Sequence, residues 1–114
     1  MIKYKKILLL LLTSVPLQSF GLSESNEKFC TGLSGFANHV MSLRQHGVPP
    51  KKQISAYQTS AKKHNVSKNQ NDVNLSIITD AYNEPIHNDD LEKQNVAKEF
   101  EEKYYLECIN SFLK

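Results

Sequence analysis

Two cysteines are the residues of this chain whose chemistry is easiest to name. Cys30 and Cys108 are the only cysteines among 114 residues. In an oxidising compartment, two thiols with none left over allow a single disulfide. The alternative, a redox-active or nucleophilic thiol, needs a C-x-x-C spacing or a cationic activator that lowers its pKa, and neither lies directly beside these cysteines. The pair therefore predicts a Cys30–Cys108 disulfide.

Four histidines raise the question of a metal site. His39 and His46 are seven residues apart and would share one face of a helix, while His64 and His87 lie elsewhere in the chain. Zinc sites use three or four ligands, so two imidazoles are not sufficient. The chain also lacks H-E-x-x-H, G-x-S-x-G and a phosphate-binding glycine loop. We therefore predict no catalytic residue, no metal and no cofactor; a metal-binding or enzymatic role for His39 and His46 is the alternative.

Arg44, Gln45 and Tyr82 are candidate binding residues. An arginine in the sequence RQHG could bind an anion or a peptide. The structural alternative is that Arg44 interacts with the negative end of its helix and pairs with Asp80 or Glu84. Tyr82 lies in the sequence AYNEP, where a half-buried tyrosine beside a helix stop is the structural alternative to a ligand site.

A lysine-rich stretch is the other candidate site. Five lysines occur without an intervening acid, whereas residues 89–107 hold seven acids and three lysines. These charges indicate solvated helix faces, or a lysine-rich helix that lies across the acidic one and offsets its charge. The functional interpretation is a basic patch for an anionic envelope component or an acidic protein. The lysines are Lys51, Lys52, Lys62, Lys63 and Lys68.

The first 21 residues have the pattern of a secretory signal. MIKYKK is a positive n-region, ILLLLL an apolar h-region, and residues 13–21 end in small residues. The apolar run is shorter than a spanning helix needs, so an uncleaved anchor is the lesser alternative. Cleavage after Gly21 would remove three lysines and no acid, which leaves 11 bases against 12 acids. A nearly neutral domain gives no reason to expect a nucleic acid as partner.

Residues 22–114 read as a single domain of helices. Apolar residues follow from Phe29 at helical spacing, with a cap at Ser23 or Ser25 and a stop at Gly47. Further helices are expected at about 51–64, from an Asp72 cap to Pro85, and from a capping box of Asp89 and Glu92. The predicted core stripes include Leu33, Phe36, Val40, Leu43, Ile54, Tyr57, Ala61, Val73, Ile77, Ile78, Val96, Phe100, Tyr104, Cys108 and Phe112.

These elements predict an all-α fold, a small up-down bundle of about four helices tied by one disulfide. In such a bundle the start of the first helix and the end of the last lie at the same end, where Cys30 and Cys108 can meet. The bond closes a loop of roughly 79 residues, worth about 4.5 kcal/mol at most in the chain-entropy model.

Several short motifs follow one another in a fixed order. They are FCTGLSGFANHVMSLRQHG, IITDAYNEP and FEEKYYLEC, in the order C…RQxG…AYxxP…YxxC. This order resembles a group of uncharacterised small exported helical proteins of bacteria and their phages. The resemblance covers Phe29 to Cys108. It implies a shared fold and disulfide, and it implies no activity.

The function expected from the sequence is that of a periplasmic or secreted protein that binds or inhibits another envelope or secreted protein. A small disulfide-tied bundle without catalytic motifs favours an interaction role over an enzymatic one. Contact with the membrane is expected only through the signal segment before cleavage.

Overall fold

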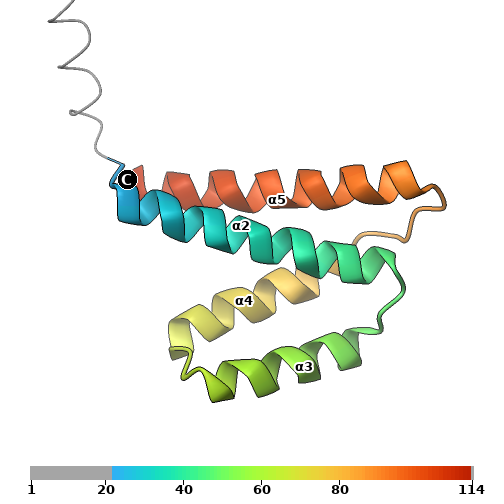
Figure 1. Ribbon diagram of the computed structural model, residues 1–114, viewed down its shortest axis with the longest axis horizontal. Helices are drawn as coiled ribbons and strands as arrows, with labels where there is room; N and C mark the ends of the chain where they lie inside the picture. The colour runs from blue at the N-terminus through green and yellow to red at the C-terminus, as the bar shows by residue number, and fades with distance from the viewer. Residues whose placement is uncertain (1–21, 114) are drawn as a thin grey trace, which may run out of the picture.

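The computed structural model describes residues 22–113, which form four α-helices and no strand (Figure 1). The helices are α2 (Glu24–Gln45), α3 (Pro50–Lys63), α4 (Lys68–Ala81) and α5 (Asp90–Leu113). The all-α bundle predicted from the sequence is confirmed. The signal segment predicted for residues 1–21 lies outside the described residues. Between residues 22 and 113, no helix has the length and apolar character needed to cross a bilayer.

The two long helices, α2 and α5, pack antiparallel along their length. The disulfide joins them at the end where α2 begins and α5 finishes, with an S–S distance of 2.10 Å and a Cα–Cα distance of 5.5 Å. The predicted pairing of Cys30 with Cys108 is therefore present, and both residues are buried. We call this region the disulfide end.

The two short helices, α3 and α4, form a second hairpin that packs against α2, and the C-terminal part of α4 also contacts α5 through Asp80 (Figure 1). Only the C-terminal part of α4 belongs to the main core. Its fully buried residues are Ile77, Ile78 and Ala81. Toward its own N-terminus, α4 diverges from α2. The buried core is made by Ala37, Val40, Met41, Ile77, Ile78, Ala81, Ala97 and Phe100.

The ends of α2 follow the sequence signals closely. The Ser23 side chain accepts a hydrogen bond from the backbone N–H of Asn26, as an N-cap does. At the other end, Gly47 has φ +85°, and Val48 N–H donates to the Leu43 carbonyl. This is a Schellman arrangement with glycine in the left-handed conformation. The predicted stop of the first helix is confirmed.

The start of one helix differs from the prediction, and the start of another agrees in position but not in its capping. α4 begins at Lys68 with Ser67 as its cap, so the prediction that Asp72 caps this helix is wrong. Serine is as good a cap as aspartate, and the Lys68–Asp72 ion pair favours the extra turn. α5 begins at Asp90, directly after the predicted cap residue Asp89. The Glu92 carboxylate, however, bonds to His87, outside the helix, and so the structure does not show the predicted capping box.

Candidate functional site

The candidate residues Arg44 and Tyr82 meet at one corner of the bundle and contact each other. The Arg44 guanidinium lies 5.0 Å from the centre of the Tyr82 ring, and its Nε donates to the Glu84 carbonyl at 3.0 Å. The Tyr82 hydroxyl donates to the Val48 carbonyl at 2.6 Å and accepts from Gln53 Nε2 at 2.7 Å. Arg44 thus contacts a backbone oxygen and an aromatic ring. It does not pair with the Asp80 or Glu84 carboxylate, which was the structural alternative in the sequence.

The buried side chain of Gln45 forms hydrogen bonds with the backbone of the segment that connects α4 to α5. Its side chain is only 1% exposed. Its Nε2 donates to the Pro85 carbonyl and its Oε1 accepts from the His87 N–H, both at 2.9 Å, while Lys93 Nζ donates to its backbone carbonyl. With these polar atoms occupied inside the protein, Arg44, Gln45 and Tyr82 have the contacts of structural residues.

A third cluster, which sequence reasoning did not find, ties α4 to α5. Lys103 Nζ and the Tyr104 hydroxyl both donate to Asp80 Oδ2, at 2.8 and 2.6 Å. Burial opposes the charge of Asp80, but these two hydrogen bonds outweigh it and hold the pKa of Asp80 below its usual range. The hydrogen bond from Lys103 to Asp80 raises the pKa of Lys103. Burial, together with the hydrogen bond from Tyr104 to Asp80, raises the pKa of Tyr104. The cluster is partly exposed and acts as a clamp between helices.

The lysines of α3 lie on the face of that helix that points to solvent. Lys51, Lys52, Lys62 and Lys63 are all exposed, and no ion pair among the described residues involves them. α3 packs against α4 and α2, and α5 lies beyond α2 (Figure 1). The interpretation in which the lysine-rich helix lies across the acidic one is therefore wrong.

The histidines are dispersed over the described part of the chain. His46 Nδ1 lies 2.7 Å from the Ser42 carbonyl, and His64 Nδ1 lies 2.9 Å from the Ser60 carbonyl, each at the end of its own helix. Within residues 22–113, no three His, Cys, Asp or Glu side chains gather in a group that could hold a metal ion.

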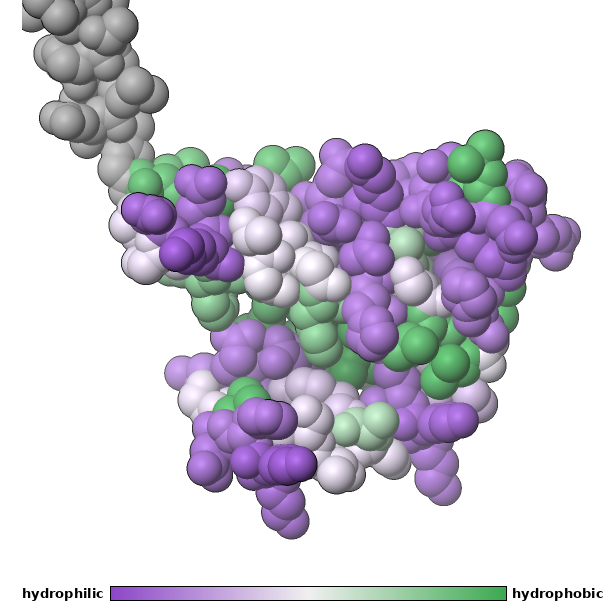
Figure 2. Space-filling model, in the orientation of Figure 1, coloured by the Kyte–Doolittle hydropathy of each residue, from purple (hydrophilic) through white to green (hydrophobic). Residues whose placement is uncertain are grey.

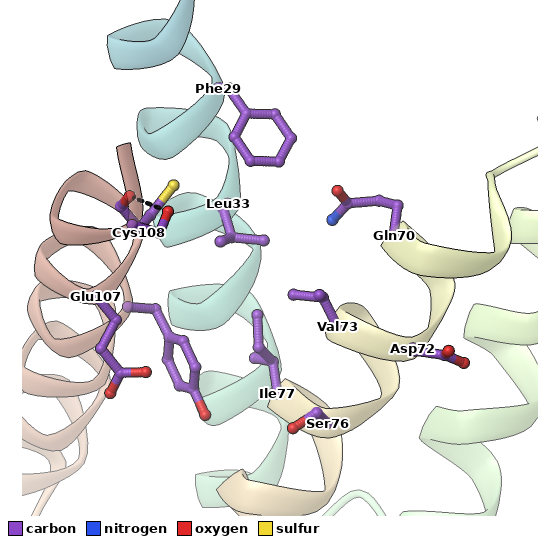
Figure 3. A pocket seen from close by; sticks show the side chains of 11 residues that line it. Phe29, Leu33, Gln70, Asp72, Val73, Ser76, Ile77, Glu107 and Cys108 are labelled. Carbon is purple, nitrogen blue, oxygen red and sulfur yellow. Dashed lines mark hydrogen bonds between the residues drawn. The ribbon is translucent and has the colours of Figure 1, made fainter. Parts of the chain in front are cut away.

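An apolar groove of about 460 Å³ opens near the disulfide end, between α4 and the α2–α5 pair. We call it the disulfide-end groove. Phe29 and Leu33 of α2 face Val73 and Ile77 of α4 across it, and Cys108 comes from α5, on the other side of α2 from α4 (Figure 3). In the surface view a hollow separates the α2–α5 layer from the lower hairpin, with hydrophobic side chains along its upper edge and hydrophilic ones along its lower edge (Figure 2). The remaining lining residues are Gln70, Asp72, Ser76, Tyr104, Glu107 and Ser111.

The sequence predicts burial of two apolar side chains that line the groove, Phe29 and Val73, and of Phe112, which contacts Phe29. Phe29 is 45% exposed, Val73 44% and Phe112 41%, and the rings of Phe29 and Phe112 meet edge to face with centres 6.1 Å apart. Each of the three residues belongs to the predicted core stripe of a different helix. The prediction that they are buried is wrong, and all three are at the same end of the molecule.

The divergence of α4 explains why the groove stays open. Asn74 of α4 donates to the Tyr57 hydroxyl of α3 at 3.0 Å and accepts from Gln70 at 2.8 Å. The Asn74–Tyr57 bond holds the first half of α4 toward α3, and the Gln70 bond, within α4, orients the Asn74 amide. Ile77, Ile78 and Ala81 hold the second half of α4 in the core. The N-terminal half of α4 therefore leaves α2 uncovered.

Comparisons with known proteins add no assignment to this geometry. No family model matches the chain, and neither the curated proteins nor the solved structures searched contain a match.

Proposed function

We propose that this protein is a small exported binding protein or inhibitor, which holds an apolar segment of another envelope or secreted protein in the disulfide-end groove. The observation that supports it is the exposure of Phe29 and Val73 on opposite walls of one opening, with exposed Phe112 against the Phe29 ring. Grooves between helices that display unburied apolar side chains are the usual receptors for amphipathic helices. The apolar side chains of the partner would cover the parts of the apolar helix faces that this fold leaves exposed.

The rim of the groove indicates the chemistry of the bound segment. Asp72 and Glu107 are the charged residues that line it, and both are acidic. Asp72 is already paired with Lys68, while Glu107 belongs to the exposed face of α5. A segment that combines apolar residues with a lysine or arginine would match this rim.

Export is part of the same proposal. The disulfide favours an oxidising compartment. Together with the signal pattern of residues 1–21, it supports a periplasmic or secreted location.

Site-directed photo-crosslinking in the compartment of the exported protein tests the proposal. A crosslinking residue at Val73 should capture one defined protein, and the same residue at Gln58, exposed on α3, should not. Val73→Lys should abolish that capture without changing the melting temperature, because the side chain is already half exposed.

The salt dependence of binding distinguishes the groove from the lysine-bearing face of α3 as the binding site. Capture through an apolar groove should persist from 0.1 to about 0.5 M salt, where exposed charges are screened beyond a few ångströms. Replacing Lys51, Lys52, Lys62 and Lys63 together by Gln should leave it largely intact. Loss of capture in that variant, with strong salt sensitivity of the parent, would assign binding to the lysines instead.

A further inference from the structure

A second opening, of about 460 Å³, lies between α2 and α3, away from the disulfide-end groove. Its floor is formed by buried Val40, Gln53 and Ile78. Half-buried apolar side chains form its walls, namely Phe36, Leu43, Val48 and Tyr57. Its exposed rim carries His39, Lys52, Ala56 and Ser60. We call this opening the α2–α3 cavity.

The charges around the α2–α3 cavity have one sign. No acid occurs between Lys28 and Asn71, a stretch that contains all of α3 and all of α2 after its first turn. Lys52 is the formal charge on the rim, and Lys51, Lys62 and Lys63 follow along the same helix. Eleven residues are about three turns, so Lys52 and Lys63 lie on the same side of α3, as do Lys51 and Lys62. An organic cation would meet only repulsion here.

The size and lining of the cavity limit the ligand further. Its volume is within the range of about 300–1,000 Å³ typical of small-molecule sites, which combine an apolar lining with few polar groups. The Phe36 and Tyr57 rings lie 5.8 Å apart across the two helices and close the wall at one end. One hydrocarbon tail or one ring system suits this shape, with its polar end outside at Lys52.

We propose that the α2–α3 cavity binds a single-tailed organic anion of the fatty-acid class, with the tail on Val40 and Ile78 and the carboxylate at the Lys52 ammonium. This site is independent of the protein-binding groove, because its ligand contacts α3 and the opposite side of α4. Charge complementarity and an apolar interior of matching size together distinguish this ligand class from neutral or cationic molecules.

Titration of the exported, purified protein with three eight-carbon probes tests the charge requirement. Octanoate, 1-octanol and octylamine share the tail and differ in the end group. Octanoate should bind at least about fivefold more tightly than either of the others at low salt, the factor expected from one surface charge contact near 1 kcal/mol. Equal affinity for 1-octanol would overturn the proposal, and so would the absence of octanoate binding.

Two lysine variants locate the carboxylate. Lys52→Gln should weaken octanoate about fivefold, whereas Lys51→Gln, which removes the same charge one position away from the cavity, should change its affinity less than about twofold. Both side chains are exposed, so neither change should alter the fold. An equal loss in both variants would show only a diffuse attraction to the basic face and would contradict the assigned contact.

Nuclear magnetic resonance shift mapping and a blocking variant locate the tail. Octanoate should shift the amide signals of residues 39–43 and 52–60, and Ala56→Trp should abolish binding because the indole fills the exposed mouth of the cavity. Val73→Lys, in the disulfide-end groove, should leave octanoate affinity unchanged. Shifts confined to Phe29, Leu33 and Val73 would overturn the assignment, as would binding to acidic phospholipid vesicles without binding of free octanoate.

Discussion

Gln45 and Tyr82 show how two short motifs become one structural unit. RQHG ends α2 and AYNEP ends α4. The Arg44 and Gln45 side chains donate to backbone carbonyls of AYNEP, and the Tyr82 hydroxyl donates to the carbonyl of Val48, the residue after RQHG. Gln53, from α3, completes the unit through the Tyr82 hydroxyl. The direction of the Gln53 amide is settled by its partners: the Tyr82 hydroxyl already donates its hydrogen to Val48, so it must accept from Nε2. Gln53 Oε1 is left buried without a partner among the described atoms.

Tyr82→Phe should lower the free energy of unfolding by about 1–3 kcal/mol, because the Val48 carbonyl and the Gln53 amide lose their shared partner. Urea unfolding followed by circular dichroism measures the change. Adding Gln53→Met to the Tyr82→Phe variant should cost less than Gln53→Met in the parent, since it removes an amide that has already lost its Tyr82 partner and keeps only the 3.5 Å bond to the Val40 carbonyl. Additive losses would contradict this coupling. Tyr105→Phe, at a half-buried tyrosine for which the described structure contains no hydroxyl hydrogen bond, is the matched control.

Asp80 makes stability depend on pH in the acid range. Its pKa in the folded protein is below the reference value of 3.8, so its contribution is complete above that value and is lost as the pH falls through the folded pKa. In the Asp80→Asn variant the melting temperature should therefore decline less steeply below about pH 4 than in the parent. The loss of stability caused by the substitution should be smaller at acid pH than at neutral pH. Melting curves from pH 2 to 7 test this. A parallel acid decline in both proteins would show that other carboxylates dominate.

The helices end where local chemistry stops them, and α2 shows this most clearly. Its left-handed Gly47 lets the chain turn toward Pro49 and Pro50, which starts α3. At the start of α4, local signals compete: Ser67 and Asp72 are both good caps, and the structure uses Ser67. A helix that begins one turn earlier brings Gln70 and Val73 onto the wall of the disulfide-end groove.

Gly47→Val should cost about 1–2 kcal/mol, because a β-branched residue is strained at φ +85° although the space around the glycine is open. The contrasting variant is Gly35→Ala, within α2, where the added methyl group also meets nothing within 4 Å. That change should stabilise the protein by about 0.5–1 kcal/mol. Thermal unfolding of both variants beside the parent measures the difference, and a neutral Gly47→Val would contradict the left-handed cap.

The assembled bundle consists of one long hairpin and one short hairpin that do not match in length. At 1.5 Å per residue, α5 is about 36 Å long with its 24 residues, whereas α4 is about 21 Å long with its 14. The short hairpin covers the middle of α2 and leaves the disulfide end open. There the Cys30–Cys108 bond links the two long helices where α4 does not support them.

Removal of the disulfide by Cys30→Ala and Cys108→Ala together should lower the free energy of unfolding by up to about 4.5 kcal/mol. Amide hydrogen exchange should increase most near Phe29 and Phe112, while Ile77 and Ala81, in the central core, should stay protected until global unfolding. Intact mass with and without alkylation shows the state of the cysteines. Two free thiols in the exported protein would contradict the bond.

Helical periodicity, caps and cysteine count were sufficient to predict the all-α fold, the stop at Gly47 and the pairing of Cys30 with Cys108. These signals act within a few turns of one helix, or through a pairing that has no competitor. The positions of Phe29, Val73 and Phe112 could not be predicted in the same way. Periodicity shows that each helix has an apolar face, but burial of that face requires a neighbour that reaches it. The angle at which α4 leaves α2 depends on contacts between residues far apart in the chain, such as Asn74 with Tyr57 and Asp80 with Tyr104. Both candidate sites are therefore products of long-range packing.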